Sequence, residues 1–357
     1  MLFGEVGYNE GRLRIEENAK IGERRKMDWT YWATLCAVAP LIGFIGMYSG
    51  GFWGVGCGWL VVPTMLIFGF TPMEAAGVGL LQMAPSMIGT VCREAPRIGW
   101  GAGSFGRNLT LPMALGALAT SFCGLPINEF FHRLCGSTAI SVGFAGFMLF
   151  IGWKTLFGAA RSFGDASPTV FTPSTRFWAF VCGLGAGVFS SVLGVGGAMV
   201  FRPALANGFK ATEEETARSV RFLLLTTTLT GGATYLFSGD GFDETVFVLA
   251  ALIAVGGAVG FPLGARSHRV VLEAGRSNLA RRSFAIICGI VLINVSLKLA
   301  GLTLASQVAT GVCALGLTAF LVSFVCWARR NPTADSVAAR RREESSKTKN
   351  GGNGRDA

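Results

Sequence analysis

Long apolar stretches set the strongest limit on what this chain can fold into. Residues 30–53, 177–201, 245–264 and 305–327 each offer the roughly 20 apolar residues that cross a lipid bilayer as a helix. Only 15% of the 357 residues are charged, whereas a soluble domain carries about a quarter. Because lipid cannot hydrogen-bond to the backbone, the sequence predicts an all-α, polytopic membrane protein.

A glycine-rich stretch occurs twice within these apolar regions. It reads GVGCGWLVVP at residues 54–63 and GVGGAMVFRP at residues 194–203. Glycine weakens a helix and proline removes a backbone donor, so we expect both copies to break a helix, with Pro63 and Pro203 as structural helix breaks. Broken backbone is tolerated at membrane depth only where protein buries it or where it lines a cavity. Paired interruptions in two halves of a chain point to the binding site of a transporter.

The two copies divide the chain into two repeats. Each repeat is predicted to hold a Gly-rich broken or re-entrant arm and about three further spans. The predicted parts are a polar N-terminal segment (1–28), a first transmembrane repeat (29–156), a linker (157–176), a second transmembrane repeat (177–300), an extra transmembrane helix (301–328) and a basic, disordered tail (329–357).

Similar features recur at an offset of 140 residues. Both 71–74 and 211–214 read as helix starts with a carboxylate in the first turn. A stripe of glycines in the second repeat permits close helix packing, and small residues occupy the same place in the first. The second stripe is Gly256, Gly260 and Gly264, and the first is Gly116, Thr120 and Gly124. The remaining spans are predicted at 108–125, 138–156, 215–237, 245–264 and 283–300.

The charges of the loops bear on orientation. If each arm re-enters without crossing, each repeat makes three net crossings and the two repeats are inverted. The basic loops at 93–107, 157–176 and 265–282 then share one side with the tail, and positively charged loops mark the cytoplasmic side. We therefore predict a multi-pass protein of the cell (inner or plasma) membrane with a cytoplasmic C-terminus.

The doubled motif resembles that of the TauE/SafE sulfite exporter family. The Gly-x-Gly pattern followed by Val-Val-Pro or Phe-Arg-Pro carries the resemblance, together with the acidic helix starts and a basic loop that ends in Trp100. The similarity covers about residues 35–300. It departs from the usual triple glycine at Cys57 and Ala198, and Arg202 stands where an aliphatic residue is usual. The resemblance implies a permease for a small sulfur-containing anion such as sulfite or an organosulfonate.

We expect this anion to bind between the two breaks, near the membrane midplane. Exposed N–H groups and the dipole at the start of a half-helix favour an anion. Arg202 is a charge inside an apolar run, which makes it a functional candidate. The predicted substrate-binding residues are Gly54, Gly56, Cys57, Gly58, Gln82, Gly194, Gly196, Gly197, Arg202 and Thr227.

Each of these residues also has a purely structural interpretation. The glycines could serve close packing alone, and the side chain of Arg202 could extend to the membrane surface. Cys57 could be a small apolar packing residue. The hydroxyl of Thr227 could bond to its own helix.

The sequence argues against several other classes of protein. The predicted spans hold no histidine, no carboxylate pair and no Ser–His arrangement, so we predict no catalytic residues; a membrane-embedded enzyme is the weaker alternative. The nine cysteines lack zinc spacing, and we expect no metal and no cofactor. The net charge of +10 lacks the aromatic-interleaved motif of nucleic-acid binding. A transporter of another small anion, a carboxylate for instance, is the nearer alternative.

The acidic residues are expected only near the ends of spans. No buried carboxylate relay for protons is visible, so we expect transport driven by the substrate gradient and membrane potential, or by a proton carried on the substrate. His132 and His268 both fall in predicted loops. The expected partners are the small anion and membrane lipid, and the sequence indicates no particular oligomeric state.

Overall fold

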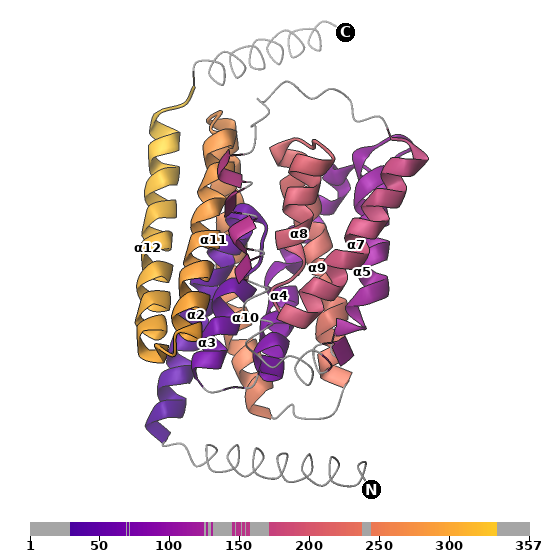
Figure 1. Ribbon diagram of the computed structural model, residues 1–357. Coiled ribbons are helices and arrows are strands. Elements are labelled where there is room, and N and C mark those ends of the chain that lie inside the picture. The colour runs from indigo at the N-terminus through magenta and orange to yellow at the C-terminus, as the bar shows by residue number, and fades with distance from the viewer. Residues whose placement is uncertain are drawn as a thin grey trace, which may run out of the picture. The chain divides into compact units, whose positions relative to one another are not determined.

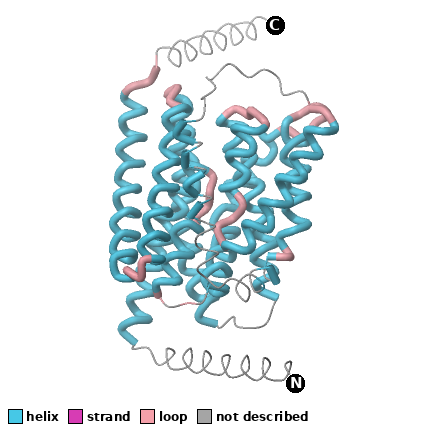
Figure 2. Tube along the Cα trace, viewed as in Figure 1, coloured by secondary structure: helices cyan, strands magenta, loops and turns pink. Residues whose placement is uncertain are grey.

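The described residues of the computed structural model are helical, apart from short connections. They are 29–68, 70, 72–124, 126–127, 130, 145–146, 148–150, 152–153, 155–157, 171–237 and 244–333. Contacts divide the chain into residues 1–39 and residues 40–357. Of the first unit the structure describes only the beginning of a helix, so the contacts below belong to the second. None of the described residues lies in a strand (Figure 2).

The first repeat is built from a broken arm and the helices that follow it (Figure 1). The arm consists of α2 (Trp29–Trp53) and α3 (Gly58–Ile67), which are separated by a short non-helical stretch. α4 (Pro72–Glu94) continues into the 3₁₀-helix η1 (Ala95–Ile98). The π-helical turn η2 (Gly106–Thr110) leads directly into α5 (Leu111–Ser121).

The second half of the chain also begins with a broken arm. Its arm consists of α7 (Pro173–Leu193), α8 (Ala198–Pro203) and the π-helical turn η3 (Ala204–Gly208). It is followed by α9 (Glu213–Phe237), α10 (Glu244–Glu273) and α11 (Ser277–Leu299), and α12 (Thr303–Arg330) comes last. In both arms the interruption is a loop segment that lies part-way along the length of the surrounding helices (Figure 2).

Within the described residues, six helices are long and apolar enough to cross a membrane, which supports the predicted multi-pass fold. They are Trp32–Trp53, Met73–Ile98, Pro173–Leu193, Glu244–Glu273, Ser277–Leu297 and Val308–Arg330. α9, expected as a span at 215–237, is not among them, because its first turns carry three glutamates and two arginines. α5 is shorter than the expected span at 108–125. The expected span at 138–156 lies largely outside the described residues.

The basic loop predicted at 265–282 is mostly helical, so that prediction was wrong. α10 continues to Glu273 and α11 begins at Ser277. The continuation is amphipathic: Gly264, Ala265, His268 and Val271 are buried at helical spacing, while the arginines at 266 and 269 are exposed. The charges that led to the prediction of a loop therefore lie on the exposed face of a helix.

Glycine stripes join each arm to a helix of the opposite repeat. Gly256, Gly260 and Gly264 of α10 lie against the carbonyl oxygens of Pro40, Phe44 and Tyr48 in α2. A Cβ atom at any of these glycines would overlap the facing oxygen. In the other pair, Gly116 of α5 lies against the carbonyl oxygen of Phe180 in α7, and the hydroxyl of Thr120 donates to the carbonyl oxygen of Leu184 across 2.7 Å. The predicted close packing is thus confirmed.

The helix start predicted for α9 is confirmed by its capping contacts. The hydroxyl of Thr212 accepts the backbone N–H of Glu215 at 3.2 Å, and Glu215 Oε2 accepts the N–H of Thr212 at 3.0 Å. Such a capping box satisfies two donors of the first turn. Glu215 thus forms the cap, and Glu214 pairs with Arg218 on the exposed side of the helix. Glu213 is the glutamate of this turn whose side chain is buried and pairs with Arg202.

Candidate functional site

The first arm breaks where two glycines adopt left-handed backbone. α2 ends at Trp53, and Gly54 and Gly56 have φ angles of 78° and 73° before α3 begins at Gly58. Residues other than glycine rarely adopt positive φ, because Cβ then approaches the following carbonyl oxygen. The glycine spacing therefore fixes the position of the break.

The second arm breaks in the same way at the corresponding residues. Gly194 and Gly196 have φ angles of 67° and 66°, and α8 begins two residues later at Ala198. The helix breaks are thus glycine turns, and the two prolines do not make them, contrary to expectation. Pro63 lies inside α3, and Pro203 closes α8, directly before the π-helical turn η3.

The two breaks contact each other. A Cβ at Gly58 would lie 2.4 Å from Cα of Val195, so the backbones are as close as glycine allows. Gly56 and Gly196 face the same two side chains, Met83 of α4 and Leu224 of α9. Every residue of both breaks is buried. Two side chains from the helices behind the arms therefore fill the space between the breaks.

Several backbone N–H groups at the breaks have no acceptor among the described residues. In the first break these are the N–H groups of Val55, Gly56, Cys57 and Gly58, and in the second those of Val195, Gly196 and Gly197. The first turn of a helix always leaves such donors unsatisfied. A buried N–H group without an acceptor is costly, so both breaks offer donors to a ligand that can accept.

The side chain of Gln82 joins α4 to the first break. Its Nε2 donates to Cys57 Sγ at 2.5 Å and to the carbonyl oxygen of Gly79 at 2.9 Å. Its Oε1 is buried and has no hydrogen-bond partner among the described residues. Gln82 and Cys57 are both completely buried. Gln82 therefore holds a free acceptor beside the free donors of the break.

The other predicted site residues take different positions. Thr227 is buried, but its hydroxyl bonds to the carbonyl oxygens of Leu223 and Leu224 in its own helix. Gly54 faces α9 and Gly194 faces Ala76 of α4. Gly197 lies against Ala186 of its own arm. The structure thus brings Gly56, Cys57, Gly58, Gln82 and Gly196 closely together.

Arg202 reaches the C-terminal end of α2, directly before the first break. It is only 3% exposed, and its guanidinium donates from Nη1 to the carbonyl oxygen of Trp53 and from Nη2 to Glu213 Oε1. Its Cζ also lies 5.7 Å from the ring centre of Phe284. Both of these nitrogens are engaged with protein groups, and the side chain does not extend to the surface. A cation at the C-terminal carbonyls of α2 is favoured by the dipole of that helix.

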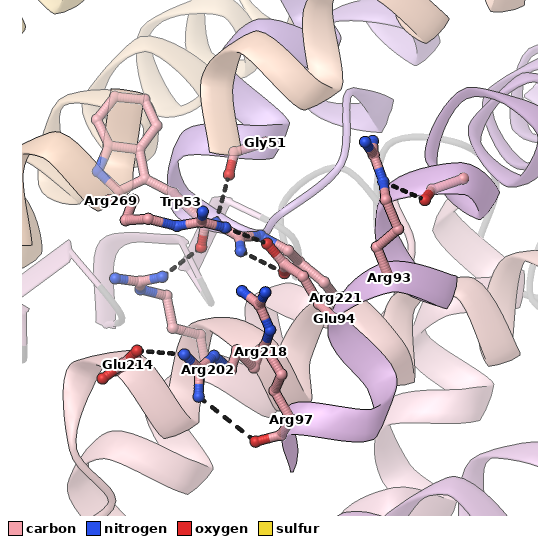
Figure 3. Close-up of polar contacts among 11 residues, drawn as sticks. Gly51, Trp53, Arg93, Glu94, Arg97, Arg202, Glu214, Arg218, Arg221 and Arg269 are labelled. Atoms are coloured by element: carbon pink, nitrogen blue, oxygen red, sulfur yellow. Dashed lines mark hydrogen bonds and ion pairs between the residues drawn. The ribbon is translucent and has the colours of Figure 1, made fainter. Parts of the chain in front are cut away.

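A second arginine binds the same helix end. Arg221 Nη2 donates to the carbonyl oxygen of Gly51 at 3.0 Å, and its Nη1 lies 2.7 Å from Glu94 Oε2. Arg269, which is about half exposed, reaches Glu94 Oε1 at 3.4 Å. Figure 3 shows these guanidinium groups around Gly51, Trp53 and Glu94. We call Glu94, Arg202, Glu213, Arg221 and His268 the ionic cluster.

The fifth member of the ionic cluster, His268, was predicted to lie in a loop. It lies instead within α10, is 2% exposed, and stacks edge-on against Phe52. Its Nε2 is 3.4 Å from Glu213 Oε1 but makes no hydrogen bond to a described residue. The side chains of Glu94 and Glu213 are each 8% exposed. Sequence reasoning missed these groups, because it treated charges near helix ends as solvated.

Within the described part of the chain, no group of three His, Cys, Asp or Glu side chains is arranged to hold a metal ion. What the site offers is backbone N–H groups, one free amide oxygen and a set of paired charges. The N–H groups can donate hydrogen bonds to an anion, and the amide oxygen can accept one. The charged side chains can exchange their ion-pair partners.

Comparison with known proteins gives one match. The family model described as "Sulfite exporter TauE/SafE" matches residues 38–299. That range contains both breaks, the second arm, the first arm from residue 38 onward and the whole ionic cluster. No curated protein and no solved structure matches the chain.

Proposed function

This chain belongs to the sulfite exporter TauE/SafE family, whose members are membrane transporters of sulfite or related anions, and we propose that it is a permease for a small sulfur-containing anion. The substrate class is sulfite or an organosulfonate, and the binding site is the contact between the two glycine breaks. The observation that carries this proposal is the set of unpartnered N–H groups at both breaks.

The chemistry of the breaks suits a sulfur oxyanion. Three oxygens of a sulfite or sulfonate group can accept hydrogen bonds from N–H groups of both breaks, and N–H groups at the start of a helix favour an anion. The free Oε1 of Gln82 can accept the hydroxyl of hydrogen sulfite. No carboxylate of the described residues is bonded to either break. Hydrogen bonds from the N–H groups of the breaks can therefore replace the water that the anion loses on binding, and the site needs no full positive charge.

Entry of an anion requires movement of the two side chains that fill the site. Met83 and Leu224 both face Gly56 and Gly196, so we infer that the site is closed in this structure. We infer that the arms move against α4 and α9 during transport, which opens the breaks to one side at a time. Arg202 takes part as the gating residue at the edge of the first break, because it holds the carbonyl oxygen of Trp53.

The orientation in the membrane is part of the proposal. The repeats are inverted, the protein lies in the inner or plasma membrane, and the C-terminus is cytoplasmic. Arg329 and Arg330 at the end of α12 support this side for the C-terminus. A reporter that fluoresces only in the cytoplasm, fused after residue 357, is expected to be bright; a dark fusion with an active periplasmic reporter at the same position refutes the orientation.

The site is tested by flux of sulfite and of an organosulfonate into proteoliposomes. We expect Gly196→Leu and Arg202→Leu to abolish flux that the wild type carries. Matched controls are Gly185→Leu, where an added Cβ meets nothing within 4 Å, and Arg218→Leu, which removes an exposed pair. Arg202→Leu with Glu213→Gln avoids an unpaired buried carboxylate. Wild-type flux through both site variants would refute the site, and no flux of either anion by the wild type would refute the substrate class.

A further inference from the structure

The ionic cluster contains one group whose charge is not fixed. Arg202 and Arg221 carry two positive charges, and Glu94 and Glu213 carry two negative ones, so these four buried side chains balance. His268 is the remaining member. Histidine is the side chain that changes charge near neutral pH. A proton on His268 therefore adds a positive charge to a buried set that is otherwise neutral.

His268 and Arg202 share one carboxylate oxygen. Arg202 Nη2 is bonded to Glu213 Oε1, and His268 Nε2 lies 3.4 Å from that same atom without a hydrogen bond to a described residue. In the imidazolium both ring nitrogens carry hydrogen, so Nε2 then becomes a charged donor. Two cations compete for the oxygen, and the bond of Arg202 to Glu213 is weakened.

Among the described residues, the carboxylate beside His268 is already paired with Arg202. Glu213 and Arg221 face His268 from α9, Arg202 faces it from α8, and the ring of Phe52 lies against it from α2. Beyond them lies Glu94 of α4, which pairs with Arg221 and with Arg269 of α10. A buried surplus of charge is expensive, so it is removed either by loss of the proton or by arrival of an anion.

We propose that His268 is the proton-binding site through which anion transport is coupled to protons. A proton adds to the free lone pair of the imidazole, and no other bond is broken. The imidazolium draws Glu213 from Arg202, Arg202 loosens its hold on the end of α2 at Trp53, and the adjoining first break opens to an anion that balances the added charge. One proton and one monovalent anion then move together. The inference rests on the proposed function for its anion.

Transport of a sulfonate that does not titrate separates this site from protons carried by the substrate. The probe is 2-hydroxyethanesulfonate in proteoliposomes with the membrane potential clamped at zero. For the wild type, a gradient of one pH unit is expected to drive about tenfold accumulation, because one pH unit is equivalent to a tenfold concentration ratio at one proton per anion. His268→Gln is expected to equilibrate the probe without accumulation. The matched control His132→Gln replaces the other histidine of the chain and is expected to behave as the wild type.

The proton site has a second test that does not depend on transport. In His132→Gln the imidazole of His268 is the only one, so nitrogen NMR of labelled histidine reports its protonation alone. We expect a larger protonated share at a given pH when sulfite is added than when chloride is added, and loss of this difference in Glu213→Gln.

The outcomes distinguish the two ideas. Accumulation by His268→Gln equal to that of the wild type, or a His268 signal that does not change between pH 5 and pH 8, refutes the proton site while leaving the anion permease intact. A wild type that moves neither sulfite nor the sulfonate at any pH refutes the permease, and the NMR measurement then still decides whether His268 binds a proton.

Discussion

Arg221 and Glu94 form an ion pair across 2.7 Å although 127 positions separate them in the chain. Their side chains are 4% and 8% exposed, and the same guanidinium holds the carbonyl oxygen of Gly51. One side chain thus ties the start of α9 to the ends of α4 and α2. Because these three ends belong to both repeats, the pair stabilises the junction between them.

Arg221→Met should be among the most destabilising substitutions in the chain. It leaves Glu94 buried with only the long contact to Arg269, and breaking a buried pair costs about 3–5 kcal/mol. Thermal unfolding in detergent measures the loss. Arg218→Met is the control, because its pair with Glu214 is partly exposed and is worth about 0.5 kcal/mol or less. Adding Glu94→Gln to Arg221→Met should recover part of the loss. Equal effects of the two arginine substitutions would contradict the buried pair.

The glycine stripes predict that an alanine substitution in either stripe lowers the stability of the protein. Gly256→Ala and Gly116→Ala each place a Cβ atom on a carbonyl oxygen of the facing arm, so both should lower the unfolding temperature. Gly289→Ala in α11 meets nothing within 4 Å and should be neutral or stabilising by up to about 1 kcal/mol, since alanine favours helix. The idea of close packing at both contacts fails if only one of the stripe variants is destabilised.

The glycines of the breaks allow backbone strain to be separated from packing. Gly54 and Gly194 both have positive φ, which costs about 1–2 kcal/mol for alanine. A Cβ at Gly54 meets its nearest atom at 3.5 Å, whereas one at Gly194 overlaps Cα of Ala76. Gly194→Ala should therefore destabilise more than Gly54→Ala, measured by unfolding. Gly54→Asn should be milder still, because asparagine enters the left-handed region more readily.

Thiol labelling reports whether the breaks open. In a variant that keeps only Cys57, a membrane-impermeant methanethiosulfonate should react slowly, because the thiol is fully buried and bonded to Gln82. A variant that keeps only Cys92, which is exposed, should react rapidly. Addition of 2-hydroxyethanesulfonate, which does not react with the reagent, should speed the labelling of Cys57 as Met83 and Leu224 separate. Equally fast labelling of both variants without an anion would contradict the closed arrangement.

Local chemistry made the arms predictable from the sequence. The Gly-Val-Gly spacing demanded backbone that a helix cannot supply, and the structure has left-handed glycines at 54, 56, 194 and 196. The stripe at Gly256, Gly260 and Gly264 follows helical periodicity, so its contact with a neighbouring helix also followed from the sequence alone. Both features depend on residues that are close together in the chain.

The ionic cluster could not be found in this way. Its arginines reach far along the chain, Arg202 to the carbonyl oxygen of Trp53 across 149 positions and Arg221 to Glu94 across 127, and nothing in the spacing of these residues indicates a contact. Each charge taken alone looks like a solvated helix end. Only the return of the second arm places Arg202 at the end of α2, and the amphipathic extension of α10 then covers the cluster with His268.

The exchange of arms between the repeats has a consequence for the origin of such a chain. α2 lays its carbonyl oxygens on the glycines of α10, and α7 lays its own on those of α5, so neither half completes its helix pairs by itself. A primitive protein with one half would leave its arm and its small-residue stripe uncovered. Two copies could cover these surfaces if the arm of each copy packed against the small-residue stripe of the other, as the two halves of this chain do. Fusion of such an interlocked dimer into a single polypeptide would preserve that arrangement and leave each copy free to change.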